Sequence, residues 1–514
     1  MVIYVIPLLA ILIVLPSLWA FLSLLRHPVP KSVEWATKGH GPLSMLKTLI
    51  YSMYSIRATL HRGYNNFSET GKPYLIIHWN LRPRVILPRE HIPWIASQPE
   101  EILSHKRVDI EQLAQNSTAQ RPDARDFGMR KIFSKELARA LPQLYAVILE
   151  ASVEAIDTAL GSDPEWRLKK ILDVITRIVA ETSYRVILGP ELSRDKRLVT
   201  DATSYNFLFG VTGILVGQVA PWPLKQLVGM VVGLPLKYYF FRLKRRLVPV
   251  FEERLRAHRS GAATRSKSIV PDGLAWTFNV VIDSEYGSTA TASEIADFFI
   301  QSVIPITNFP SIVGTNFMQD LLAADADYNL QETLRAEAHS FFNSDCSHPK
   351  SPTNHLQTTE SALRETLRTH PLVIYSVCRE VMPKQGVIAP DGTHLPQGSW
   401  VCVSSMDIHH DEDLYSHPTA YNPYRFIHIS EAGKPVLKEM LSTPSPSFLA
   451  FSFGDHVCPG RVYASQMMKV IVAYMLANYE FRPVRQWAPG MIIGMIQIPS
   501  FWTCFSVRRR RRRV

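Results

Sequence analysis

Cys458, a lone cysteine in a glycine-bracketed loop, is the residue whose surroundings point most directly to chemistry. It lies in the stretch FSFGDHVCPGR, and Gly454 and Gly460 flank it. Apolar residues with helical spacing follow, so the thiol is predicted at the start of a helix, where loop N–H groups and the helix terminus stabilise a thiolate. No nearby cysteine or histidine stands at zinc-site spacing. A thiolate held there is well placed to be an axial ligand to a haem iron.

The alternative for such a cysteine is a buried, unreactive thiol. Against it stands the pattern F-x-x-G-x-x-x-C-x-G, which is formed by Phe451, Gly454, Cys458 and Gly460. This pattern resembles the haem-binding loop of the cytochrome P-450 family. The resemblance implies that these residues bind haem b and that Cys458 ligates its iron. Glycines are needed where the backbone passes close to a flat macrocycle.

Two charged segments upstream of the loop extend the resemblance. The sequence ETLR places Glu365 and Arg368 on one face of a helix predicted to start near Thr358. Arg425, in YNPYRF, resembles the arginine that completes a Glu–Arg–Arg cluster beneath the cysteine loop in this family. An i,i+3 ion pair alone is usually a solvated surface pair. The order of the motifs, with an H-x-D segment at His409 between them, gives the pair its weight.

Three cations are predicted to contact the haem propionates. His456 stands two residues before the cysteine, where the family often has a basic residue. Arg379 follows the ETLR helix and resembles a second contact, and Arg130, in an early helix, is the nearest candidate for a third. The alternative for each is an ordinary surface cation.

The long apolar stretch from Thr291 to Ala324 is predicted to be a core-crossing helix, kinked at Pro305 and Pro310. In the family, an acidic or amide residue and a threonine on this helix deliver protons to bound oxygen, a general-acid role. Here Phe309 and Pro310 occupy the positions of the threonine pair.

The nearby groups able to relay a proton are Thr307 and Asn308, which are the catalytic candidates. Three functions stay open. The protein is a monooxygenase with a displaced or substrate-assisted relay, or a haem-thiolate enzyme of desaturation, rearrangement or isomerisation. The third, of another class, is a non-catalytic relative that binds a ligand.

The composition argues against a disulfide-rich protein and against a nucleic-acid-binding protein. The 514 residues are 46% hydrophobic and 20% charged, which is globular, and five scattered cysteines do not form a disulfide framework. Six of the +11 net charges lie in Arg508–Arg513, so the chain is not basic throughout and no nucleic-acid partner is expected. Residues 508–514 are predicted to be a solvated basic tail, with contact to anionic lipid headgroups as the alternative.

The N-terminus predicts a membrane anchor. Residues 2–25 carry no charge and are long enough to span a bilayer, and basic residues follow directly. A proline-containing linker at 26–34 then leads to one catalytic domain at 35–507, which is expected on the cytosolic side of the endoplasmic reticulum. A second apolar stretch at 205–247 is interrupted by prolines and lysines, so a surface helix pair at the bilayer edge is favoured over a second span.

The predicted fold is mainly α with a smaller β region, the cytochrome P-450 fold, behind one transmembrane helix. Short strands are expected on both sides of a turn at Asn80–Arg82 and at Trp400–Ser404. The chain resembles fungal members that oxidise small apolar secondary metabolites such as terpenoid or alkaloid intermediates. The resemblance implies electrons from NADPH-cytochrome P-450 reductase, with cytochrome b5 as an optional second donor.

Overall fold

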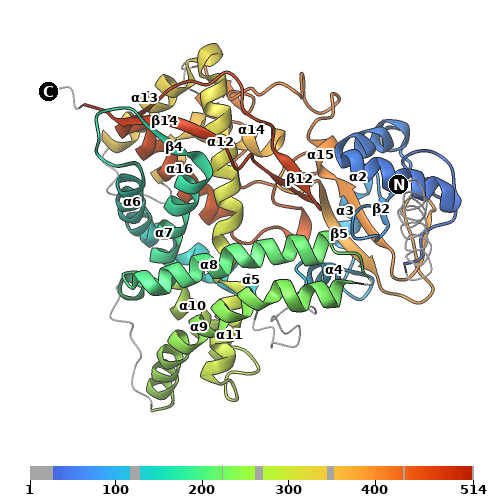
Figure 1. Cartoon of the computed structure of the whole chain (residues 1–514), viewed down its shortest axis with the longest axis horizontal. Coiled ribbons are helices and arrows are strands. Elements are labelled where there is room, and N and C mark those ends of the chain that lie inside the picture. The colour runs from blue at the N-terminus through green and yellow to red at the C-terminus, as the bar shows by residue number, and fades with distance from the viewer. Residues whose placement is uncertain are drawn as a thin grey trace, which may run out of the picture.

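The computed structural model describes residues 27–115, 128–222, 224–260, 270–343, 352–431 and 435–511. A helical body and a smaller sheet region share one molecule, with α12 running through the middle of the view and the larger sheet beside α2 (Figure 1). The predicted membrane anchor at residues 2–25 lies outside the described residues.

Helices dominate the described chain, as the sequence predicted. They are α2 (Gly41–Asn66), α3 (Ile92–Ser97), α4 (His105–Gln112), α5 (Met129–Lys131), α6 (Ala138–Leu160), α7 (Ile171–Leu192), α8 (Lys196–Thr212), α9 (Lys225–Arg259), α10 (Gly273–Ile282), α11 (Ala292–Ser302), α12 (Asn308–Tyr328), α13 (Leu330–Asn343), α14 (Gln357–Thr369), α15 (Ser405–Ile408) and α16 (Arg461–Asn478). Short 3-10 or π turns join several of them: η4 (Ile132–Leu137), η5 (Gly213–Val219), η6 (Ile304–Thr307) and η8 (Gly454–His456).

The larger sheet has the strand order β1-β2-β8-β5-β3, in which only the β2–β8 pair is parallel. Its strands are β1 (Tyr74–Ile76), β2 (Arg84–Ile86), β3 (Leu103–Ser104), β5 (Tyr375–Val381) and β8 (Trp400–Ser404). The predicted strands around the turn at 80–82 and at 400–404 are confirmed. A three-stranded sheet contains β11 (Tyr479–Phe481), β14 (Cys504–Arg509) and β4 (Arg167–Lys170), and β12 (Met491–Ile493) and β13 (Ile496–Ile498) form a hairpin.

The predicted linker is packed onto the larger sheet. Val33 and Trp35 are buried in its hydrophobic cluster, and Trp35 forms a bridge to Leu75 of β1. The Ser399 hydroxyl also donates to the carbonyl of Pro28 at 2.8 Å. The boundary placed at residue 35 therefore falls inside a packed segment, because apolar side chains on both sides of it are buried.

The predicted core-crossing helix is divided in two. A capping box at Thr291 and Glu294 starts α11, and η6 separates α11 from α12. Pro305 lies in this break with ψ of 22°, and its missing N–H cannot continue the helix. The second predicted kink is wrong, because Pro310 lies in the first turn of α12, where backbone N–H groups have no partner within the helix.

Helix α14 is unusual because it is polar and buried. Every residue from Thr358 to Thr369 is buried, including Glu365 and Arg368. The helix begins at Gln357, in agreement with the start predicted near Thr358. A polar helix can be buried only if its charges are paired. The residues that pair with the charges of α14 are part of the candidate site.

The basic tail is partly a strand. Arg508 and Arg509 belong to β14 and pair with β11, and Arg510 donates its backbone N–H to Asn478 at 3.0 Å. Strand β14 therefore extends two residues past the tail boundary predicted after residue 507. A run of arginines does not predict a strand. In the structure, Arg508 forms an ion pair with Glu480, and Arg509 forms one with Asp157.

Within the described ranges, no helix has the length and apolar character needed to traverse a bilayer. The apolar stretch at 205–247 forms α8, η5 and the first part of the 35-residue helix α9. These cross the lower half of the view (Figure 1).

Candidate functional site

The loop around Cys458 is fixed by its backbone. Gly454 has φ of +74°, and a Cβ there would lie 2.6 Å from the Cβ of Ala96, so glycine is required. The N–H of Cys458 donates to the carbonyl of Phe451 at 2.9 Å, and Arg461 donates to the carbonyl of Cys458 at 3.0 Å. Phe451 is partly buried against the main hydrophobic cluster. The loop therefore presents the thiol from a rigid frame directly before α16.

The Cys458 thiol combines enclosure with an accessible surface. Burial raises the pKa of the Cys458 thiol, whereas the backbone N–H groups of Gly460 and Arg461 act to lower it. The residue nevertheless remains exposed, so a group from outside the chain can reach it. No described atom lies within 4 Å of a Cβ built on Gly460, so the protein's own packing leaves room beside that backbone. An accessible sulfur with open space beside it suits a haem ligand, and the N–H groups suit a ligating thiolate.

Arg379, on β5, is fully buried and incompletely paired. Its Nη1 donates to the carbonyl of Cys378 at 2.9 Å, while Nε and Nη2 have no partner among the described residues. Burial lowers the pKa of Arg379. A buried guanidinium without an acid is costly. A haem propionate is a carboxylate that could supply the missing acceptor, so Arg379 fits its predicted role.

His456, the second residue predicted to contact a propionate, has several charged or aromatic neighbours. Its Nε2 lies 3.1 Å from a carboxylate oxygen of Glu100, and its ring stacks on His105 at 4.5 Å between centroids. Burial lowers the pKa of His456 to about 4, and His105, Arg379 and Arg130 also lower it through their charges. Arg379 and Arg130 are thus near enough to act on His456 through their charges, and His105 stacks directly on its ring. Sequence reasoning missed His105 because it lies in no motif and joins the group only through the fold.

The carboxylate of Glu365 organises a buried ion cluster. Arg368 donates to its two oxygens at 2.8 and 2.9 Å, and Arg425 Nε lies 3.0 Å from both. The backbone N–H of Asn422 adds a fourth donor at 2.9 Å. Glu365 and Arg368 have no exposed surface. The predicted Glu–Arg–Arg grouping is therefore brought together in the interior, where every charge has a partner.

This cluster reaches the cysteine loop through His409. Arg368 donates to the carbonyl of His409 at 2.6 Å, and the ring Nε2 of His409 accepts the N–H of Leu449 at 2.8 Å. Burial lowers the pKa of His409 to about 3, so the ring is neutral and can accept. Leu449 stands just before the loop that starts at Phe451. The H-x-D motif thus links the ion cluster to the thiolate loop.

The two catalytic candidates, Thr307 and Asn308, contact helix α8. Asn206, on α8, donates its amide to the hydroxyl of Thr307 and, at 2.9 Å, to the side-chain oxygen of Asn308. The Asn308 amide in turn donates to the carbonyl of Asn206 at 2.8 Å. Thr307 is buried in η6, whereas the adjacent Phe309 is 47% exposed. Both candidates are therefore hydrogen-bonded to α8, a partnership for which the sequence holds no signal.

Comparison with known proteins agrees with this geometry. The family model described as "Cytochrome P450" matches residues 325–498, which include Glu365, Arg425 and Cys458. The chain is 30% identical to the cytochrome P450 monooxygenase lnaC of Aspergillus flavus over 94% of this chain and 93% of that protein. It is 28% identical to polB of Polytolypa hystricis over 96% of each chain. It is 30% identical to nodZ of Hypoxylon pulicicidum over 88% of this chain and 87% of that one. Both relatives are also cytochrome P450 monooxygenases.

The fold and the thiolate loop define a haem-thiolate protein. The chain belongs to the cytochrome P450 family, and it is a monooxygenase. Its cofactor is haem b, whose iron is bound by a cysteine thiolate. The interpretation of the chain as a non-catalytic ligand-binding relative is accordingly not retained.

Proposed function

We propose that this monooxygenase oxidises a small apolar secondary metabolite, such as a terpenoid or alkaloid intermediate, by hydroxylation, epoxidation or successive oxidations. Electrons come from NADPH-cytochrome P450 reductase, with cytochrome b5 as an optional donor. The observation that carries the proposal is the Cys458 loop, where the backbone N–H groups of Gly460 and Arg461 act on an exposed sulfur.

Cys458 would hold haem b, which would supply the oxygen chemistry: with two electrons from the reductase and two protons, one atom of O2 would enter the substrate and the other would leave as water. The chain's own residues have three tasks. Cys458 holds the iron, and Gly460 and Arg461 direct N–H groups at its sulfur. Arg379 and His456 are placed to bind propionates, and Glu365 holds the arginines beneath the loop.

A second candidate is desaturation, rearrangement or isomerisation by the same haem-thiolate site. The observation that favours it is that both candidate proton-relay residues, Thr307 and Asn308, are hydrogen-bonded to Asn206. Thr307 accepts from Asn206, and both ends of the Asn308 carboxamide bond to Asn206. Chemistry that needs less proton delivery would tolerate this arrangement.

The proposed location is the endoplasmic reticulum membrane, with residues 2–25 as a single anchor and the catalytic domain in the cytosol. One face of α9 supports contact with lipid. Its side chains are 54–62% exposed and recur at helical spacing: Leu227, Met230, Val231, Leu234, Tyr238 and Phe241. Such a stripe suits the bilayer surface. Replacing Leu227 and Leu234 by Glu should then reduce vesicle binding of protein lacking residues 1–26, and unchanged binding would remove α9 from the contact.

The first experiment is the reduced, carbon monoxide-bound difference spectrum of microsomes that contain the protein, with Cys458→Ala as the control. A thiolate-type Soret band present in the wild type and absent from the variant is expected. A histidine-type band, or an equal band in Cys458→Ala, would overturn the assignment of the ligand. Product formation that requires both reductase and oxygen would then support oxygenation, whereas turnover without them would favour isomerisation.

A further inference from the structure

The three-stranded sheet β11-β14-β4 has one face packed on the protein and one face turned to solvent. On β14, Phe505 and Val507 are each 1% exposed, so their side chains define the inner face. Along a strand, side chains alternate between the two faces, and directly paired residues share a face. The register therefore places Leu168 and its partner Ser506 on the outer face, with Lys170 two residues further along β4.

Large apolar side chains stand on this outer face, where an antiparallel sheet normally presents polar residues to water. Leu168 is 71% exposed, and Trp502, in the turn before β14, is 78% exposed. Trp166 precedes β4 and is half-buried. Tryptophan is enriched in protein interfaces, and neighbouring exposed apolar side chains mark interaction sites.

Cations stack on both tryptophan rings. The guanidinium carbons of Arg482 and Arg508 lie 4.6 and 4.5 Å from the centre of the Trp166 ring. The ammonium nitrogen of Lys170 lies 5.6 Å from the centre of the Trp502 ring. Such contacts hold a cation beside an aromatic face. The outer face therefore combines exposed apolar surface with positive charges in defined places.

The positive charge of this face exceeds its negative charge. Arg508 pairs with Glu480 at 2.6 Å. Lys170 and Arg482 have no ion pair with an acid in the described part of the chain. The sheet and its flanking turns contain eleven basic and three acidic residues, in segments 163–170, 480–485 and 500–513. Eight of the chain's +11 net charges therefore lie here, which favours an acidic partner.

This face is remote from the thiolate and from the proposed membrane contact. Helix α16 separates the Cys458 loop from β11, and its 18 residues span roughly 27 Å at about 1.5 Å each. In Figure 1, β4 and β14 lie at the upper left, whereas α2 and the larger sheet lie on the right. The first described residues pack on that larger sheet. A bilayer that holds the proposed anchor is therefore expected on the side away from β4 and β14.

We propose that the outer face of β11-β14-β4 docks an acidic surface of a partner protein. Trp502 and Leu168 contact apolar side chains of that partner, and Lys170 and Arg482 pair with its carboxylates. Tryptophan and arginine are the residues that most often dominate binding energy at interfaces, and complementary charges orient the partners. Because the face is remote from Cys458, docking leaves the haem site free.

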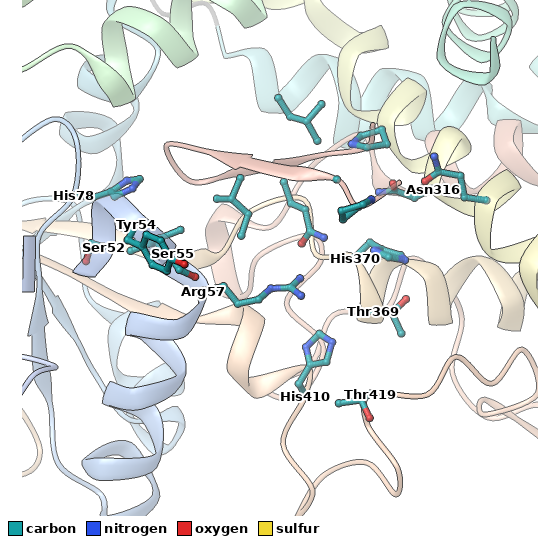
Figure 2. Close-up of a pocket in the computed structure, with 18 of the residues that line it drawn as sticks. Ser52, Tyr54, Ser55, Arg57, His78, Asn316, Thr369, His370, His410 and Thr419 are labelled. Atoms are coloured by element: carbon teal, nitrogen blue, oxygen red, sulfur yellow. The ribbon is translucent and has the colours of Figure 1, made fainter. Parts of the chain in front are cut away.

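The test is fluorescence anisotropy with two labelled peptide probes and the full-length, haem-loaded protein in phosphatidylcholine nanodiscs. One probe has four Glu-Glu-Phe repeats and the other has eight glutamates, so their charges are equal and only the first is aromatic. Trp502→Ser and Arg482→Gln are the test variants. Arg57→Gln is the matched control, because Arg57 is an exposed arginine at the pocket beside α2, which Figure 2 shows. Each variant is first shown to retain the wild-type reduced carbon monoxide spectrum.

Saturable binding of the aromatic probe is expected, and it should weaken as sodium chloride screens the charges. Trp502→Ser should weaken it about tenfold, as is typical of an interface tryptophan. Arg482→Gln should weaken it about threefold or more, since a charged hydrogen-bond donor is lost. Arg57→Gln should bind the aromatic probe as the wild type does.

Three results would overturn the proposal. Equal affinity for the two probes, or wild-type affinity in both test variants, would mean that charge alone holds the peptide, as the terminal arginines could do. Absence of saturable binding would exclude the docking surface. Cosedimentation with phosphatidylserine vesicles in place of peptide binding would assign the face to lipid. The readout needs no substrate and no turnover, so it is independent of the proposed oxidation.

Discussion

The ion cluster beneath the cysteine loop and the break in the central helix are both polar interruptions of an apolar interior, yet they are held very differently. Glu365 receives four donors, and Arg368 also donates to backbone carbonyls of three other residues. The break at η6 is tied to α8 through one side chain, Asn206. Among the described side chains, the first region is fixed by hydrogen bonds between charged groups and the second by hydrogen bonds between neutral ones. We therefore expect substitutions in the first to remove the cofactor and substitutions in the second to alter chemistry while the cofactor stays bound.

The strongest expected effect is that of Glu365→Ala. It leaves the buried charges of Arg368 and Arg425 without an acid, a change that costs about 3–5 kcal/mol. The cysteine loop should lose its support, and the reduced carbon monoxide spectrum should be absent. Glu332→Ala is the matched control, because Glu332 forms an i,i+3 pair with Arg335 but is 60% exposed. A normal spectrum in Glu365→Ala would show that the cluster is dispensable.

Arg379→Leu should have the next largest effect and should separate folding from cofactor binding. Without haem, removal of an unpaired buried guanidinium should leave the free energy of unfolding unchanged or increase it. With haem, the loss of a propionate partner should weaken binding by roughly tenfold or more. Haem titration and thermal melting of both forms measure the two effects, with the exposed Arg107→Leu as control. Equal haem affinity in Arg379→Leu and wild type would exclude the propionate contact.

The same contrast explains what the sequence could predict. Glu365, Arg425 and Cys458 stand in short motifs that resemble those of the cytochrome P450 family, and this resemblance predicted that Glu365 and Arg425 meet although they lie 60 residues apart. The stack of His456 on His105 and the bond from Asn206 to Thr307 join segments that are distant in sequence. No local pattern specifies such pairs, because only tertiary packing creates them.

The errors have physical causes as well. Proline was expected to kink the helix at Pro310, but the cost of its missing N–H disappears in a first turn. Consecutive arginines were expected to be solvated, but strand pairing with β11 gives them a backbone role that charge patterning does not reveal. Strands β1, β2 and β8 of the larger sheet were predicted, because short apolar runs bounded by turn residues specify strands locally, whereas β3 and β5 were not.

Thr307→Ala tests the helix break at η6. Haem binding should persist, since Thr307 makes no contact with the ion cluster. If its hydroxyl delivers protons, product formed per NADPH should fall and peroxide should rise, by up to the roughly 10²-fold typical of general-acid groups. Asn206→Ala should cause a smaller change, because the hydroxyl remains, and Thr307→Ser should restore wild-type coupling. Unchanged product with no added peroxide in Thr307→Ala would remove this residue from the reaction.

The smallest expected effect belongs to the C-terminal arginines and extends the comparison to the molecular surface. Arg509 contacts Asp157 at 2.5 Å and the Tyr479 hydroxyl at 2.8 Å, whereas Arg511 is exposed and has no partner among the described residues. Arg509→Ala should lower the free energy of unfolding by about 1 kcal/mol, the upper end for pairs in contact with solvent. Arg511→Ala, with the same change in net charge, should leave the melting temperature unaltered. Equal melting temperatures for the two variants would mean that the arginines act only through their summed charge, and that the strand is held by its backbone alone.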